Sequence, residues 1–454
     1  MTNSALVRHP LTVAGAVMAT VSAVAFILLA LALAVGMFHR NPYAGLIVFV
    51  TIPALFVLGL LLIPLGIRLQ RRRLRDHPER AGDWPVLDFR RPEVRRRALL
   101  FTALTAVNVI VITLAGYSSL HWMESPSFCG QVCHTPMQPQ FTAWQAAAHQ
   151  RVACVECHIG EGVGGFVHAK LSGVRQLVNV VTNRVPKPIP PGAHMEPGAQ
   201  GQTCTGCHDP GRIAGDRLRV VHEYADDEAN TETTTVLQLH VGASPSSARA
   251  IHWHASPGTR VEYVSTDAGH QTIPYVRVTN ADGTVKEYKT AEATDQIVRS
   301  GERRTMDCID CHNTVGHPIA PTPEIAVDRA IARAQVSRQL PFVRREAVKL
   351  MTASYPSQEA GTQAIGRGLE AFYASRGGAP DQQAIARTVT ALQTLYGRNV
   401  FPTMKVSFGS YPDHRGHTTS NGCFRCHDES HTAADGSTIS GDCEYCHKQL
   451  ENPL

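Results

Sequence analysis

The chain has 454 residues, a length that allows two or three domains, and 43% of them are hydrophobic and 18% charged. Its formal net charge of +5 is unevenly divided: residues 1–117 carry +8, whereas the remainder has 30 basic against 33 acidic residues. A chain whose basic surplus is confined to its first quarter does not fit a nucleic-acid-binding protein.

Three uncharged apolar segments come first, at residues 11–38, 43–67 and 98–120. Each is long enough to cross a bilayer core of about 30 Å as a helix, so the sequence predicts a transmembrane anchor over residues 1–120 with three helices. The first segment resembles a signal peptide, but its apolar run is longer than the usual hydrophobic region of one.

The orientation of this anchor follows from its arginines. The loop 68–97 contains eleven arginines, whereas the loop between the first two segments contains only Arg40. Basic loops stay on the cytoplasmic side of a membrane. We therefore expect a protein of the bacterial cytoplasmic (inner) membrane, with everything from about residue 121 on the external, periplasmic side and the membrane itself as a partner.

All twelve cysteines of the chain fall in six short motifs, and a histidine directly follows the second cysteine of each. In chain order, the first to sixth motifs consist of Cys129, Cys133 and His134; Cys154, Cys157 and His158; Cys204, Cys207 and His208; Cys308, Cys311 and His312; Cys423, Cys426 and His427; and Cys443, Cys446 and His447.

Three chemistries compete for such paired cysteines. Disulfides suit an even cysteine count in an exported chain, but they need no histidine after every second cysteine. Zinc sites usually separate their Cys and His ligands by several residues, so that the chain can wrap a tetrahedron. Covalent c-type haem explains every position, because two thiols form thioethers and the adjacent histidine ligates iron. The sequence predicts six haem c groups, although the first motif has three residues between its cysteines.

The external region divides by its patterns. Residues 121–216 hold haems one to three, and a helix within 163–182 either lies along the lipid headgroups or packs as an ordinary core helix. Residues 217–300 contain strand-like runs at 233–241 and 259–265 and a hairpin around NADG at 280–283, which predicts a small β insert. Residues 301–454 hold haems four to six.

Residues 323–397 within the last region lack cysteine and read as helices, with Val327, Ile331 and Ala334 on one stripe. The predicted fold class is thus a membrane-anchored multihaem cytochrome c: three N-terminal transmembrane helices, then a mostly α and loop region packed around haem, with a small β insert.

A second axial ligand is needed on the opposite face of each six-coordinate haem, normally His or Met. Met137 is the candidate for the first haem, against ordinary packing as the alternative. The distal histidine candidates, each weighed against a surface or hydrogen-bonded role, are His149, His222, His252, His254, His317, His417 and His431. His317 and His431 follow a motif histidine too closely to reach around the same porphyrin, so each is expected to serve a neighbouring haem.

These residues resemble the NapC/NirT family of membrane-anchored multihaem quinol dehydrogenases. The resemblance is densest around residues 126–208, in CGQVCHTPM, AAHQRVACVECHIGEG and FVHAKLSGVRQL, and the stretch from DCIDCHNTVGH through FPTMKV to GCFRCHDESH is similar to longer, electron-exporting members. It implies that Met137 ligates the first haem and that Lys170 lines a quinol site. The chain departs from the family in having six motifs instead of four and three predicted membrane helices instead of one.

The expected function is electron transfer from menaquinol or ubiquinol to a periplasmic or membrane redox protein that acts as acceptor. Lys170 would orient the quinol, and Glu161 or His168 would accept a proton. Two alternatives stay open: a haem-wire subunit of a larger respiratory complex without its own quinol site, and a terminal reductase, of nitrite for example, with an open haem.

Overall fold

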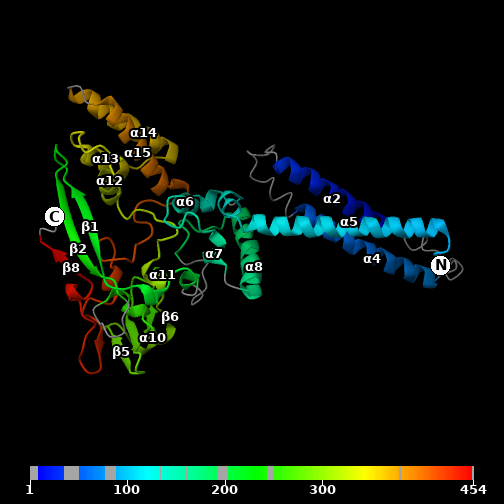
Figure 1. Ribbon diagram of the computed structural model, residues 1–454, viewed down its shortest axis with the longest axis horizontal. Helices are drawn as coiled ribbons and strands as arrows, with labels where there is room; N and C mark the ends of the chain where they lie inside the picture. The colour runs from blue at the N-terminus through cyan, green and yellow to red at the C-terminus, as the bar shows by residue number, and fades with distance from the viewer. Residues whose placement is uncertain are drawn as a thin grey trace. The chain divides into compact units, whose positions relative to one another are not determined.

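The chain forms two compact units, Met1–His134 and Thr135–Leu454, which are described separately (Figure 1). The computed structural model describes residues 9–34, 51–76, 88–132, 134–159, 162–191, 203–242, 250–377 and 381–451.

The first unit consists of long helices. They are α2 (Pro10–Ala34), α4 (Ile52–Asp76) and α5 (Pro92–Met123), followed by the short π-helical turn η3 (Phe128–Val132). Two of them, α2 and α4, are long and apolar enough to cross a membrane by length and composition. The third predicted segment, 98–120, lies inside α5, and its crossing of a membrane stays a prediction. Parts of the first two predicted segments, 35–38 and 43–50, lie outside the described residues.

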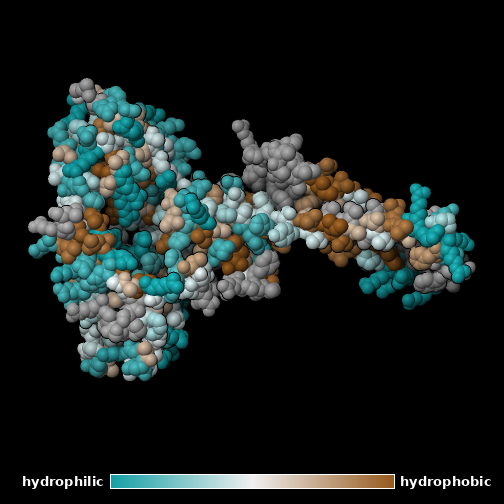
Figure 2. All heavy atoms as spheres, viewed as in Figure 1, coloured by the Kyte–Doolittle hydropathy of each residue, from teal (hydrophilic) through white to brown (hydrophobic). Residues whose placement is uncertain are grey.

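Helices α2 and α4 meet along a seam of small residues. A Cβ added to Gly15 would lie 2.7 Å from the carbonyl oxygen of Gly59, and one added to Gly59 would lie 2.7 Å from the backbone nitrogen of Ala19. Other bulky side chains of the two helices point away from this seam, and Val17 and Leu61 are largely exposed. Figure 2 shows the hydrophobic residues of these helices on their outer surface. Small residues inside and apolar residues outside are typical of helices that pair in lipid.

The second unit combines helices and turns that lie near the motifs in sequence with a separate group of helices that contains no cysteine. Near the motifs lie α6 (His134–Gln145), α7 (Cys154–His158), α8 (Gly162–Val181), α10 (Asp295–Ser300), α11 (Cys308–Cys311), and the 3-10 turns η4 (Pro210–Arg212), η5 (Ile251–Ala255), η6 (Pro402–Met404), η7 (Gly422–Arg425) and η8 (Cys443–Tyr445). The longer group consists of α12 (Pro323–Ala332), α13 (Val343–Thr352), α14 (Gln358–Arg376) and α15 (Gln382–Asn399).

Two antiparallel sheets replace the single small insert expected from the sequence. One has the order β1-β2-β8 and the other β6-β3-β4-β5-β7. The strands are β1 (Asp216–Tyr224), β2 (Glu232–His240), β3 (Arg260–Ser265), β4 (Tyr275–Thr279), β5 (Val285–Lys289), β6 (Glu302–Thr305), β7 (Thr432–Ala433) and β8 (His447–Leu450). The predicted hairpin joins β4 to β5. Both sheets also take strands from beyond residue 300, because β6, β7 and β8 fill edges that the local strands leave unpaired.

The cysteine-free helices α12, α13, α14 and α15 gather around their own apolar core (Figure 1). Val327 and Ile331 are buried in it, as the stripe in the sequence predicts. Ala334 is not part of that stripe, since α12 ends at Ala332 and Ala334 is exposed, with a left-handed backbone. Ala330, which the predicted stripe does not include, is the third residue of α12 in this core.

Asn230 joins the turn between β1 and β2 to this helical group. Its side chain is fully buried, and its amide nitrogen donates to the carbonyl oxygens of Arg338 and Leu340, each at 2.9 Å. Its side-chain oxygen accepts from the backbone nitrogen of Arg344 at 3.0 Å. The backbone of Asn230 is left-handed, with φ of 49°, a conformation that asparagine tolerates better than most residues.

We expect Asn230→Ala to lower the free energy of unfolding by about 2–4 kcal/mol, because three buried backbone groups lose their partners. Asn280→Ala is the matched control: among the described residues its side chain bonds only Thr284, across an exposed turn, and its loss should cost less than about 1 kcal/mol. Thermal unfolding of the detergent-solubilised protein measures both. Equal effects of the two substitutions would contradict this role of Asn230.

Candidate functional site

Short helical turns present the cysteine pairs of the motifs. Cys154 and Cys157 lie on α7, and Cys308 and Cys311 on α11. Residues three apart project from the same side of a helical turn, so each C-x-x-C pair can face one edge of a bound group. At α11, Asp307 and Asp310 form a capping box that holds the turn in place. Cys133 and the side chain of His134 lie outside the described part of the chain.

Five motif histidines each face a second histidine from elsewhere in the second unit. The pairs and the separations of their ring centroids are His158 and His317 at 5.9 Å, His208 and His149 at 6.1 Å, His312 and His252 at 6.1 Å, His427 and His254 at 5.8 Å, and His447 and His417 at 6.1 Å.

The separation is constant while the ring orientation is not. The five distances lie within 5.8–6.1 Å, yet the interplanar angles run from 8° to 87°. Attraction between rings in contact would select an angle, whereas two imidazoles on opposite faces of one metal can rotate freely about their common axis. Two metal–nitrogen bonds of about 2 Å, with the reach from each nitrogen to its ring centre, give about 6 Å. The residues present therefore fit haem bound between each pair.

The environment keeps several of these rings in the neutral form that binds a metal. Burial lowers the pKa of His317 to about 4, with a smaller contribution from His158. Burial also lowers the pKa of His254, next to His427. A neutral ring needs no proton removed before its nitrogen donates to iron.

The remaining predicted axial ligands are placed differently. His222 hydrogen-bonds Glu232 at 2.6 Å, and His431 is buried with its Nε2 at 2.6 Å from the carbonyl oxygen of Ile273. Neither ring faces a motif histidine within the described residues. Met137 is half-buried on α6, and its role as a ligand stays a prediction.

Helix α8 carries the predicted quinol residues. Lys170 is half-buried and His168 exposed on this helix, while Glu161 lies outside the described residues. One face of α8 is an exposed apolar stripe of Val167, Leu171, Val174, Val178 and Val181. Leu171 and Val174 are 66% and 61% exposed, which favours the headgroup alternative for this helix over a core helix.

Cysteines of successive motifs are neighbours in space. The thiols of Cys204 and Cys308 share a hydrogen bond, which raises the pKa of Cys204. Burial raises the pKa of Cys311 to about 12, and the nearby thiol of Cys423 adds to that shift. The same kind of electrostatic contact links Cys157 to Cys207 and Cys446 to Cys423. The second to sixth motifs therefore follow one another in space in their chain order.

A buried polar cluster between the fourth and fifth motifs was not anticipated from the sequence. Asp310, inside the fourth motif, accepts from the hydroxyl of Tyr263 and from the backbone nitrogen of Asp307. Arg425, inside the fifth motif, donates to the carbonyl oxygen of Asp310 at 2.8 Å. The only sequence signal was a charged residue between the cysteines of the fourth and fifth motifs, which does not reveal whether its side chain points inward.

His414 completes this polar cluster. Its Nδ1 lies 2.9 Å from the carbonyl oxygen of Asp310, to which it donates in the neutral form. Its Nε2 lies 2.7 Å from the side-chain nitrogen of Gln271 and accepts from it. Burial, followed by the charge of Arg425, lowers the pKa of His414 to about 4.

Comparison with known proteins gives two matches. Residues 91–189 match the model of the NapC/NirT cytochrome c family, N-terminal region. Over 456 residues the chain is 37% identical to the cytochrome c-type protein ImcH of Geobacter sulfurreducens, covering 97% of this chain and 88% of that protein. No solved structure matches the chain.

The pKa of His414 predicts a specific loss of stability in acid. An unfolded histidine titrates near pH 6.5, so below that pH the unfolded chain takes up a proton that folded His414 does not bind until about pH 4. The contribution of His414 to the free energy of unfolding is complete above pH 6.5 and is lost as the pH falls toward 4. The loss amounts to about 1–2 kcal/mol at pH 5. Chemical unfolding at pH 7 and at pH 5 measures the free energy of unfolding of each protein. Between these pH values His414→Gln should lose less of that free energy than the unmodified protein does. An equal loss in the two proteins would contradict this role of His414.

Proposed function

The chain belongs to the NapC/NirT cytochrome c family, and from this premise we propose that it transfers electrons from a membrane quinol, through six haems, to an acceptor on the periplasmic side. Membership makes it a membrane-anchored cytochrome with covalently bound haem c that works in electron transport with redox partners. The number of haems, the quinol and the direction of transfer are parts of the proposal.

The observation that carries the proposal is the set of five histidine pairs with a common separation. We assign one haem to each pair, attached through the cysteines of the corresponding motif, and one more to Cys129, Cys133, His134 and Met137. Haem supplies one-electron redox chemistry, and its axial ligands set the potential. The chain supplies two ligands for each iron and the spacing from one motif to the next.

The quinol end of the path is proposed to lie along α8. Its exposed apolar stripe would rest at the lipid headgroups, where Lys170, adjacent in sequence to Leu171 of that stripe, orients a quinol. Oxidation of one quinol releases two electrons and two protons, and His168 or Glu161 would accept a proton on the way to the external side. The arginines of loop 68–97 would stay on the cytoplasmic side of the membrane, which would put α8 and the motifs on the external side.

The two other functions differ in what they need from the chain. A terminal reductase needs a haem with one open face, and five motif histidines instead face a second histidine. A haem wire needs no quinol site. The exposed stripe of α8 beside Lys170 favours contact of this helix with the membrane, and thus the quinol dehydrogenase over the haem wire. The acceptor that fits best is a soluble or membrane redox protein on the periplasmic side.

The first test is reduction by quinol in lipid vesicles. We expect about six haems per chain by pyridine haemochrome, and reduction of oxidised haem by a menaquinol or ubiquinol analogue that is blocked by a quinone-site inhibitor. Leu171→Glu with Val174→Glu should slow this reduction about tenfold while reduction by dithionite is unchanged, because charge on the stripe opposes its contact with lipid.

Leu218→Glu is the matched control for the α8 variant, since Leu218 is a 67% exposed leucine on β1. It should reduce with quinol at the rate of the unmodified protein. Absence of any inhibitor-sensitive reduction by quinol would favour the haem wire, and a haem count well below five would remove the basis of the proposal.

The second test concerns the distal ligands. In His254→Ala the partner ring of His427 is lost, so we expect one of six haems to become high-spin in its ferric electron paramagnetic resonance spectrum, with all six still attached. His222→Ala is the control, because His222 bonds Glu232 and faces no motif histidine within the described residues. A wholly low-spin spectrum of His254→Ala would overturn this assignment.

A further inference from the structure

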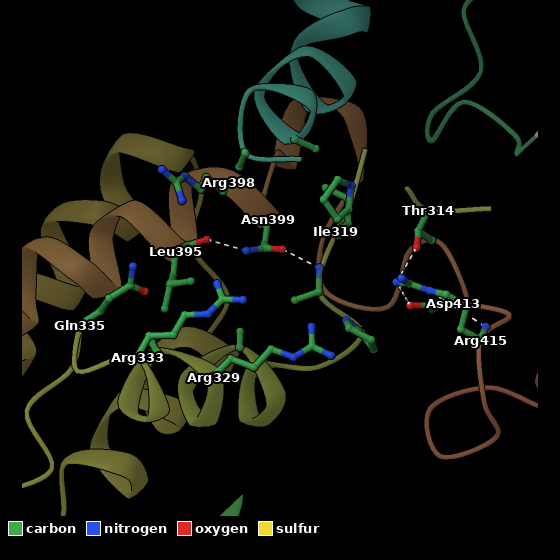
Figure 3. A pocket seen from close by; sticks show the side chains of 17 residues that line it. Thr314, Ile319, Arg329, Arg333, Gln335, Leu395, Arg398, Asn399, Asp413 and Arg415 are labelled. Atoms are coloured by element: carbon green, nitrogen blue, oxygen red, sulfur yellow. Dashed lines mark hydrogen bonds and ion pairs between the residues drawn. The ribbon is translucent and has the colours of Figure 1, made fainter. Parts of the chain in front are cut away.

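The helical group α12–α15 contains no cysteine, yet one of its faces closes a cavity beside a haem motif. The cavity has a volume of about 230 Å³. Its walls are α12, α15, the C-terminal end of α6, the segment 314–321 after the fourth motif, and the loop at 413–415 (Figure 3). Asn399 at the end of α15 ties two of these walls together, as its side-chain oxygen accepts from the backbone nitrogen of Ala320 at 2.7 Å.

The charge of this cavity is strongly unbalanced. Its charged lining residues are Arg329, Arg333, Arg398, Arg415 and Asp413, four cations against one anion. Asp413 is already paired, since Arg415 donates to both of its carboxylate oxygens. In the part of the chain that the structure describes, the side chains of the other three arginines make no hydrogen bond or ion pair.

Such a cluster of cations is unfavourable by itself. Burial lowers the pKa of Arg329, and repulsion from Arg219, Arg333 and Arg415 adds to the shift although Asp413 opposes it. Guanidinium groups held together in a partly desolvated space are stabilised by an anion, and planar carboxylates match their fork of donors best. The cavity therefore has the chemistry of a carboxylate site.

The position of the cavity points to one source of carboxylates. Arg415 donates to the hydroxyl of Thr314 at 3.3 Å, two residues after His312. Asn313, directly after His312, donates to the carbonyl oxygen of Pro412 at 2.7 Å and accepts from the backbone nitrogen of His414 at 3.0 Å. The cationic wall therefore lies beside the fourth motif. A haem carries two propionate carboxylates on the edge away from its thioethers.

We propose that this arginine cavity binds the propionates of the haem attached at Cys308, Cys311 and His312, with Arg329 and Arg333 as the main ion-pair partners. The inference rests on the haem attachment proposed above. It gives the cysteine-free helices a function, because α12 brings fixed positive charge to one particular haem. Positive charge favours the reduced state, which has one more electron, so these arginines raise the potential of that haem relative to the same site without them.

The test is a potentiometric titration of the full-length protein, followed by visible absorption. Arg329→Gln should move one of six components to a more negative potential and leave five unchanged, and Arg329→Gln with Arg333→Gln should move the same component further. Arg329→Lys keeps the charge and should move it less than Arg329→Gln. Arg387→Gln is the control, since Arg387 lies exposed on α15 near Asp381; it should move none.

Several outcomes overturn the inference. Unchanged potentials in both glutamine variants, or shifts spread over several components, would overturn it. The proposed function would still stand if pyridine haemochrome gives six haems per chain. A low haem count in the unmodified protein would instead count against that function. A free anion from solution could bind the same arginines in place of the propionates. Calorimetric titration with inorganic phosphate tells the two apart. Saturable phosphate binding that is lost in the double variant would show that the cavity is open to outside anions, and it would overturn the propionate assignment.

Discussion

The gap of about 6 Å between paired imidazoles is the constraint on which the second unit depends. The pairs interlace along the chain: His158 faces His317, while His254, between them in sequence, faces His427. Any cut of the chain between His149 and His447 separates the two members of at least one pair. Residues 135–454 therefore behave as one compact unit instead of a row of haem domains.

Stabilisation is divided unevenly within that unit. The helices α12–α15 bury a contiguous apolar core, of which Ile365, Leu369 and Leu392 are fully buried members. The motif segments have little of this kind, and most of their turns contain no buried apolar residue. Apolar burial can hold the helical group together, whereas the motif segments rely on ligands, thioethers and the polar cluster around Asp310. We expect loss of haem to destabilise the motif segments far more than the helices α12–α15.

The sequence was most informative where the chemistry is local. The c-type cytochrome motifs, the membrane-length helices α2 and α4 and the NADG hairpin each depend on residues close together in sequence, and each could be predicted. The partner of each motif histidine could not, because His254 and His431 look alike in sequence and only the tertiary fold turns one ring toward His427 and the other toward a carbonyl oxygen. For the same reason β8, at an edge set by long-range pairing, and the cluster of arginines beside the fourth motif were missed.

Strand β8 begins at His447 itself and pairs with β2, from Leu239 opposite His447 to Val236 opposite Leu450. More than two hundred residues separate these strands along the chain. If this region is exported from its N-terminal side, as proposed, the edge of β2 stays unpaired and able to join other strands until the sixth motif is exported. Attachment of a haem at that motif and closure of this sheet would then depend on the same segment, so a chain stalled before the sixth cysteine pair would lack both and be prone to self-association.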